Sequence, residues 1–376
     1  MYQSPKLLCF LIVTAMITPS IPISASEKPI YKVSKSKKAN FKQVRISIPF
    51  DMESKVFPIP VDDSIGTIYG NSLSLIRFEK SSYTIDVLKK NISKIVGTSS
   101  KFLPVFSDRL VGWAETRGFF LFDLKKNTHK YFKIRAVPGR WEYIEYLSVL
   151  DAENLRFLFI IESENDDYED PDYFMKVVSF DEEKPKESKI FELLKDGDIK
   201  KYFHSTFSNY IFFNDLATNN LEVLDITFNK THHPIVDIYN SLSDVTFRNR
   251  FTIHPNLPFA VIEGDTKLWV VTWKKNKAEI HPIIYLPKYT VKFDFSPEGK
   301  WFFIEYVEDL PASGHKEKHY AYLMPVDSSI QYFLGDPIDL GSFKGNHGTI
   351  VWSQNPMAVN IFDFINLHRW VVEGLN

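Results

Sequence analysis

The chain has 376 residues, with 45 Lys and Arg against 47 Asp and Glu, and its formal net charge is -2. This balance gives no reason to expect a nucleic acid or an acidic substrate as partner. Aromatic residues make up 15% of the chain, which is ample for a large core and argues against intrinsic disorder.

The first 25 residues have the order of a secretory signal peptide. Lys6 is their single charge, an apolar run follows from Leu7 to Thr18, and small residues surround Ala25. Twelve apolar residues rise only about 18 Å as a helix, short of the roughly 30 Å hydrocarbon core of a bilayer. We therefore predict cleavage after Ala25 and a mature chain, periplasmic or secreted, without a transmembrane segment.

The only cysteine, Cys9, lies within this apolar run and is lost on cleavage. A mature chain without thiols excludes disulfides, thiolate zinc sites, iron–sulfur clusters and cysteine nucleophiles. Residues 26–40 follow with five lysines against Glu27. We interpret them as a solvated basic linker, and the alternative is a tether to anionic lipid or polysaccharide.

From residue 41 to 376, several segments share one pattern: an apolar strand ending in an aromatic residue plus Ser or His, a tight turn, and an aromatic strand. The clearest copy runs through the turn Ser296–Gly299 into Trp301–Ile304, which predicts a strand buried on both faces. Copies marked at positions 70, 107, 148, 208, 254, 296 and 353 recur at intervals of 37 to 60 residues. Most intervals lie near the roughly 40 to 50 residues of a four-stranded propeller blade.

This repeat predicts an all-β fold, a single β-propeller of seven blades, with no helix of convincing length after the signal. The last unit ends one strand short, and the strand expected at Phe41–Phe50 lies before the first full unit. Pairing of Phe41–Phe50 with His368–Glu373 would close the ring without disulfides.

The Phe-Ser-Pro-Glu-Gly-Lys box at residues 295–300 resembles the repeat of TolB-type propellers, often called WD40-like repeats. The spacing of the repeat resembles theirs over most of the mature chain, whereas the residues themselves match in one blade. It implies a periplasmic or extracellular binding scaffold. The same repeat accompanies a separate hydrolase domain in some peptidases, and this chain has no room for one. The Gly-His and Trp-Asp pairs of ordinary WD40 repeats are missing, so six or eight blades remain possible.

An acidic stretch between the second and third strands of the third unit contains seven carboxylates in eleven residues. Such density fits a solvated loop, a loop that binds a basic partner, or a Ca²⁺ site, although the glycine usual in a Ca²⁺ loop is missing. The seven residues are Glu162, Glu164, Asp166, Asp167, Glu169, Asp170 and Asp172.

The equivalent place in the sixth unit contains His315, Lys316 and His319. Spacing of i, i+4 brings two histidines to one metal only on a helix, and Pro311 and Gly314 predict an exposed loop instead. Connections between second and third strands leave a propeller on one face, so we predict that both insertions belong to one binding face. The sequence His232-His233-Pro234 predicts a turn between outer strands.

No G-x-S-x-G, Walker A, HExxH, G-x-G-x-x-G or EF-hand loop occurs in the sequence. We predict an exported noncatalytic scaffold, without cofactor, that binds a protein, a peptide or an envelope polymer. The alternative is a propeller enzyme, a lactonase-like hydrolase or polysaccharide lyase, with a site at the channel mouth and with or without Ca²⁺. A third possibility is an inactive or sensory domain descended from such an enzyme.

Overall fold

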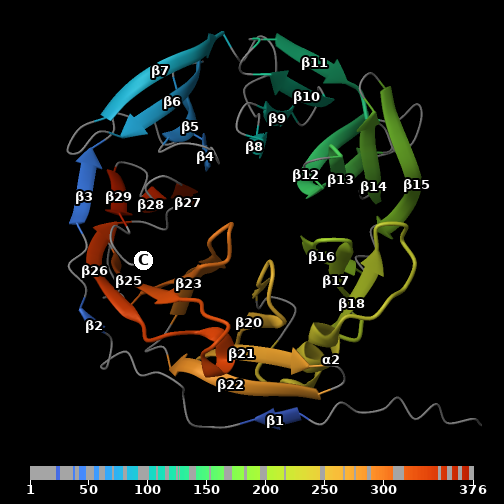
Figure 1. The fold of residues 1–376 in the computed structure, drawn as a ribbon. Coiled ribbons are helices and arrows are strands. Elements are labelled where there is room, and N and C mark those ends of the chain that lie inside the picture. The colour runs from blue at the N-terminus through green and yellow to red at the C-terminus, as the bar shows by residue number, and fades with distance from the viewer. Residues whose placement is uncertain are drawn as a thin grey trace, which may run out of the picture.

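Alternation of apolar and polar residues in short segments produces strands throughout the computed structural model, which has an all-β, propeller-like arrangement (Figure 1). The structure describes residues 23–25, 37–38, 42–47, 55–58, 64–69, 72–78, 83–91, 101–106, 109–114, 118–123, 126, 128–134, 141–151, 154–164, 172–181, 184–194, 201–215, 217–245, 250–265, 267–274, 277–285, 289–307, 317–345, 349–353, 358–362 and 366–371.

The strands form seven separate antiparallel sheets, numbered here in chain order, some of them extended by strands from the N-terminal region. Sheet 1 contains β4 (Lys55–Pro58), β5 (Ser64–Tyr69), β6 (Ser72–Phe78) and β7 (Tyr83–Lys90). Sheet 2 contains β8 (Lys101–Phe106), β9 (Arg109–Ala114), β10 (Gly118–Asp123) and β11 (Thr128–Phe132). Sheet 3 contains β12 (Trp141–Asp151), β13 (Arg156–Glu164), β14 (Asp172–Asp181) and β15 (Lys184–Leu194). Sheet 4 contains β16 (Lys201–Phe207), β17 (Tyr210–Asp215) and β18 (Asn220–Asp225).

The remaining three sheets each include one strand from the N-terminal region. Sheet 5 contains β19 (Phe251–Ile253), β20 (Phe259–Glu263), β21 (Lys267–Lys274) and β22 (Lys277–Tyr285), with β1 (Ile23–Ala25) parallel to β22. Sheet 6 contains β23 (Tyr289–Phe295), β24 (Trp301–Val307), β25 (Glu317–Pro325) and β26 (Ile338–Gly345), with β2 (Lys37–Lys38) parallel to β26. Sheet 7 contains β27 (Thr349–Ser353), β28 (Ala358–Phe362), β29 (Asn366–Val371) and β3 (Lys42–Ser47).

The expectation of seven uniform four-stranded blades requires correction. In the described part of the chain, four sheets, numbers 1, 2, 3 and 7, have four strands, whereas sheet 4 has three and sheets 5 and 6 have five. Among the described strands, none pairs with strands of two sheets, so backbone pairing does not join the sheets into a closed ring. The expected pairing of the chain ends is present within sheet 7, where Lys42–Ser47 lies antiparallel to Asn366–Val371.

Consecutive sheets pack through aromatic and aliphatic side chains on their facing sides. Phe119 of sheet 2 contacts Phe157 of sheet 3 with ring centroids 5.2 Å apart, and both side chains are fully buried. Along β24, Phe302 belongs to the core shared with sheet 5, whereas Phe303 belongs to the core shared with sheet 7. Burying each such side chain stabilises the fold by roughly 1.5–3 kcal/mol. Figure 1 shows that the first strand of a sheet lies toward the middle of the ring, as seen for β4, β8, β12, β16, β23 and β27.

The predicted turn at Ser296–Gly299 connects β23 to β24. The Ser296 hydroxyl accepts a hydrogen bond from the Trp301 backbone N–H at 3.0 Å, and Gly299 has a φ of +77°. His254 of sheet 5 reaches this turn, and its Nε2 donates to the Gly299 carbonyl at 2.7 Å. His254 Nδ1 accepts from the backbone N–H of Leu257 at 2.8 Å, so the ring is neutral, and burial lowers its pKa. The turn thus joins sheets 5 and 6.

A Gly299→Ala substitution should destabilise the fold by roughly 2 kcal/mol, because the new Cβ meets His254 Nε2 at 2.6 Å and φ is positive. Gly341→Ala is the matched control, since Gly341 also has a positive φ but no atom within 4 Å of an added Cβ. We expect a loss of about 1 kcal/mol there. Urea unfolding measures the free energy of unfolding of both variants. Equal losses would contradict the close contact of His254 with the turn at Gly299.

The helix α2 (Pro234–Ser241) follows sheet 4 and packs beside β18, the last strand of that sheet. The prediction of a simple turn at His232–Pro234 was wrong. His233 caps the helix through Nδ1, which accepts from the Ile235 backbone N–H at 3.3 Å, and Pro234 occupies the first turn. No helix in the described part of the chain has the length and apolar character needed to cross a bilayer.

The His233 cap predicts a pH-dependent stability. Burial, and to a lesser extent the neighbouring His232, lowers the pKa of His233 to about 4. Below pH 6.5 the unfolded chain binds a proton that the folded chain does not, so stability falls between pH 6.5 and 4. The loss due to this group is about 3 kcal/mol.

The variant His233→Asn retains a capping side chain that does not titrate. Its free energy of unfolding should therefore depend less on pH over this range than that of the wild type, as measured by urea unfolding at pH 7, 5.5 and 4. Parallel pH profiles for the two proteins would rule out a buried neutral His233.

Candidate functional site

The acidic stretch begins and ends on rigid parts of sheet 3. Its first member, Glu162 on β13, accepts a hydrogen bond from the hydroxyl of Tyr173 at 3.0 Å. Glu164, the last residue of β13, accepts from the hydroxyl of Tyr143 at 3.2 Å. Asp172 opens β14 and is buried. Two tyrosines from neighbouring strands therefore hold the carboxylates at the base of this segment.

The tyrosine contacts also indicate the local electrostatics. The pKa of Tyr143 is raised, first by partial removal from water and then by the nearby Glu164 and Glu162 carboxylates. A raised pKa keeps the phenol protonated, so Tyr143 remains a hydrogen-bond donor to Glu164.

The central acidic residues and two basic residues of the second insertion lie outside the described residues; they are Asp166, Asp167, Glu169, Asp170, His315 and Lys316.

His319 does not lie in an exposed loop, and that prediction was wrong. It is a fully buried residue of β25, and its Nδ1 lies 2.7 Å from Oε1 of Glu305, which is also fully buried. The strand register places His319 opposite Val307 and Phe343, and its ring stacks on Phe343 with centroids 4.9 Å apart. Because β25 begins at Glu317, His319 is inside the sheet, where pairing with a carboxylate satisfies its polar ring.

Glu305 and His319 belong to a row of polar groups that crosses sheet 6 from the inner strand outward. Lys292 on β23 lies directly opposite Glu305 in the register of the sheet. Burial lowers the pKa of Lys292, whereas the Glu305 carboxylate opposes this shift. A second oxygen of Glu305, Oε2, is buried without a hydrogen-bond partner among the described residues. The ammonium of Lys292 and the imidazole of His319 thus flank one buried carboxylate.

Further polar contacts join the inner strands of sheets 5 and 6. The Thr252 hydroxyl on β19 donates to Oδ1 of Asp294 on β23 at 3.2 Å. Asp294 reaches solvent, yet the surrounding protein excludes much of the water around it, and this raises its pKa to about 6. Hydrogen bonds from the Phe295 backbone N–H and from Thr252 offset part of the rise. A carboxyl with a pKa of about 6 therefore lies on the inner strand β23.

Arg250 precedes β19 and extends this polar region. Its Nε and Nη2 donate to the two carboxylate oxygens of Glu263, each at 3.0 Å, and its guanidinium lies 5.4 Å from the centre of the Phe293 ring. The bidentate geometry fixes the arginine side chain. Arg250, Lys292 and Asp294 form what we call the inner polar region, which offers positive and negative groups for ionic or hydrogen-bonded recognition.

Sequence reasoning did not identify the inner polar region. The alternation Lys292-Phe293-Asp294-Phe295 does indicate that the two charged residues share one side of a strand. No local pattern indicates that Asp294 meets Thr252 or that Phe293 meets Arg250, because Arg250 and Thr252 belong to another sheet about forty positions earlier in the sequence.

The two insertions nonetheless occupy corresponding places. The acidic stretch connects β13 to β14, and residues 308–316 connect β24 to β25, which in each case are the second and third strands of a sheet. Each sheet passes from an inner to an outer strand in the same order (Figure 1). The described strand ends that flank the two insertions, at residues 164 and 172 and at residues 307 and 317, therefore lie on one face of the ring, which we call the insertion face. Residues of sheet 6 at this face include the stacked pair Tyr306 and Tyr320, with ring centroids 5.1 Å apart.

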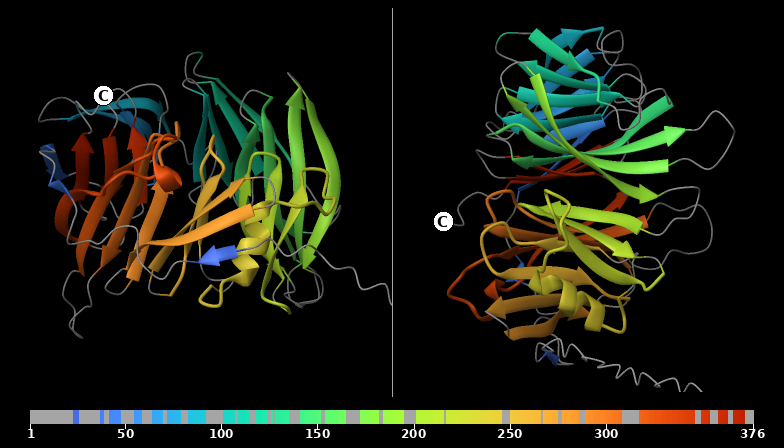
Figure 2. Two further views of the ribbon diagram at one scale, coloured as in Figure 1. Left: turned by 60° about the horizontal axis from the view of Figure 1, so that its bottom comes forward. Right: turned by 90° about the vertical axis from the view of Figure 1, so that its right-hand side faces the viewer.

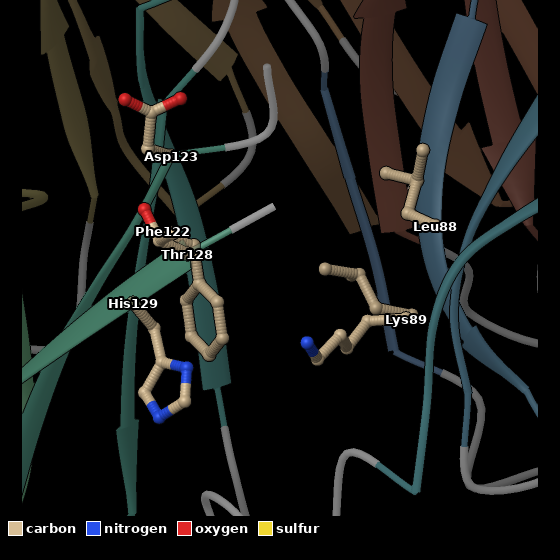
Figure 3. Close-up of a pocket in the computed structure, with 7 residues that line it drawn as sticks. Leu88, Lys89, Phe122, Asp123, Thr128 and His129 are labelled. Atoms are coloured by element: carbon tan, nitrogen blue, oxygen red, sulfur yellow. The ribbon is translucent and has the colours of Figure 1, made fainter. Parts of the chain in front are cut away.

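A small hollow lies between sheets 1 and 2. Phe122 and His129 form one wall, with ring centroids 5.6 Å apart, and Leu88 and Lys89 of β7 form the other (Figure 3). Leu73 contributes to its lining and is buried. Its lining combines the apolar side chains of Leu73, Leu88 and Phe122 with four polar ones, those of Lys89, Asp123, Thr128 and His129.

The described residues contain no group of three or more His, Cys, Asp or Glu side chains arranged to hold a metal ion. The central carboxylates of the acidic stretch lie outside that search, so the Ca²⁺ alternative stays a prediction. Neither a protein-family model nor a protein of curated function matches this chain. Functional inference therefore depends on the geometry of the chain itself.

Replacing His319 tests whether the Glu305–His319 pair is a buried structural contact. His319→Phe retains a flat ring against Phe343 but leaves the carboxylate without its imidazole partner, which should cost about 3 kcal/mol of stability. The double variant Glu305→Leu, His319→Phe removes the buried charge as well and should recover most of the loss. Thermal and urea unfolding measure the stability of the wild type and of both variants. A double variant that is less stable than the single variant would contradict this account.

Proposed function

We propose that this chain is an exported, noncatalytic β-propeller scaffold that binds a protein, a peptide or an envelope polymer through the insertion face. In this proposal the seven sheets act as seven blades of one ring, and the β3–β29 pairing fixes the two chain ends together. The resemblance of residues 295–300 to TolB-type repeats supports the scaffold role, and the signal-like order of residues 1–25 supports export to the periplasm or beyond.

The observation that carries the proposal is the placement of the acidic stretch. Tyr173 and Tyr143 hold Glu162 and Glu164, the two acidic residues of β13, so the stretch starts from a fixed base. Recognition residues on a connection carried by a rigid scaffold are the usual arrangement of a binding loop. Seven carboxylates in one short segment attract a cationic partner and accelerate its association at low ionic strength.

A propeller enzyme is the alternative, and the inner polar region is the observation that favours it. Asp294, with a pKa of about 6, has the protonation equilibrium that general acid–base catalysis near neutral pH requires. The nearby carboxylate of Glu305 already pairs with His319, however, and both are sealed from solvent. These two groups therefore serve packing, and Asp294 alone does not define a catalytic arrangement.

Neutralising the acidic stretch tests the proposed binding role. The variant Asp166→Asn, Asp167→Asn, Asp170→Asn removes three charges without touching the tyrosine-bound glutamates. Retention of envelope proteins and of a lysine-rich peptide on the immobilised chain should fall roughly tenfold at low salt, with a smaller difference at high salt.

The matched control neutralises a second acidic run of the same sheet, Asp181→Asn, Glu182→Gln, Glu183→Gln. β14 begins at Asp172 and ends at Asp181, so this run follows the opposite end of the same strand. The control should bind as the wild type does. Equal losses in the two variants would indicate a nonspecific charge effect, and unchanged binding in the first would move the site away from the insertion face.

A further inference from the structure

The N-terminal region follows the outer edges of the last three sheets. β1 lies parallel to β22, β2 lies parallel to β26, and β3 lies antiparallel to β29 (Figure 1). Figure 2 shows β1 alongside the outer strand of sheet 5 from a second direction. The outer edges of sheets 5 and 6 therefore accept an additional parallel strand from a distant part of the sequence.

Several side chains of β22 are buried on the two sides of the sheet, and the strand presents its backbone edge outward. Ala278 and Ile280 are fully buried in the core shared with sheet 4 and α2, and Ile283 is buried in the core shared with sheet 6. β1 covers three residues of this edge, in the register Ile23 to Ala278, Ser24 to Glu279 and Ala25 to Ile280. Without β1, backbone N–H and C=O groups of this edge would face solvent, as at any open sheet edge.

We propose that the outer edge of β22 is a strand-acceptor site for an extended peptide segment of a partner protein, added parallel to β22. The proposal rests on export, since cleavage after Ala25 removes the three residues that occupy the edge in the full chain. Main-chain hydrogen bonds supply the affinity in this mode of recognition, and alternate side chains supply the specificity.

The neighbouring side chains define the sequence that the site accepts. In a sheet, directly paired residues project to the same side, so the two positions opposite Ala278 and Ile280 meet an apolar surface, whereas the position between them lies beside Glu279. Glu279 is partly exposed; burial lowers the pKa of the nearby His281, and the Glu279 carboxylate opposes part of this shift. The segment that fits is therefore apolar, then Ser or a basic residue, then apolar.

A second copy of this chain is the less suitable occupant. Two identical edges related by a two-fold axis pair antiparallel, because the axis reverses the strand direction. The edge of β22 receives a parallel strand. A different polypeptide satisfies that direction without a symmetry constraint.

The test compares the full chain with its Ser24→Pro variant, in which proline removes a backbone donor at the centre of β1 and releases the edge. Ser34→Pro, between β1 and β2, is the matched control. The probe is a fluorescent peptide with the sequence of residues 20–28, SIPISASEK. We expect the peptide to bind the Ser24→Pro chain at least tenfold more tightly than either other chain and to slow amide exchange at Ala278–Ile280.

Charge exchange tests the register. A peptide with lysine in place of Ser24 should bind the Ser24→Pro chain more tightly than the unmodified peptide, and an added Glu279→Lys substitution should reverse that preference. Equal affinity for the Ser24→Pro and Ser34→Pro chains, unchanged amide exchange, or self-association of the Ser24→Pro chain in sedimentation would overturn the proposal.

Two separate measurements distinguish failure of this inference from failure of the proposed function. The mass of the N-terminus after secretion reports whether cleavage occurs, and retention by the acidic stretch reports binding at the insertion face. Neither measurement depends on the edge of β22.

Discussion

Burial of central strands on both of their faces is the constraint on which the arrangement depends. All seven residues of β24 are buried, and successive side chains belong to the cores shared with the sheets on either side. A sheet that is apolar on both faces must be covered twice, and a row of such sheets leaves exposed faces at its ends unless it curves into a ring. The aromatic content of the chain thus accounts for the propeller-like arrangement without disulfides.

Polar groups within these interfaces fix how neighbouring sheets meet. His254 joins sheet 5 to the turn of sheet 6, Ser148 and Thr206 join sheets 3 and 4 through hydroxyls 2.7 Å apart, and the indole N–H of Trp370 donates to the Leu340 carbonyl at 3.0 Å between sheets 7 and 6. A buried polar group without a hydrogen-bond partner would lower the stability of the fold more than an apolar group in the same position. Each of these contacts therefore favours one relative placement of two sheets. Apolar packing favours the ring, and these contacts make it specific.

The two proposed binding surfaces differ in kind. The insertion face lies where connections between strands begin and end, and such connections can vary without disturbing the cores. The outer edge of β22 presents backbone groups, and its recognition depends on strand direction and on alternate side chains. In the two proposals, charge dominates recognition at the first surface, whereas hydrogen-bond geometry dominates at the second, so the two proposed sites suit different partners.

The sequence by itself determined the all-β class, the turn at Ser296–Gly299 and the pairing of the chain ends, because each depends on local alternation or on the order of strands in the repeated units. It did not predict α2, although a capping residue followed by proline at 233–234 was a usable signal. It also placed His319 in an exposed loop. Only the tertiary structure decided that His319 meets Glu305 and that Asp294 meets Thr252, because these contacts depend on strand register and on which sheets become neighbours. Local sequence does not encode the distance between residues of different sheets.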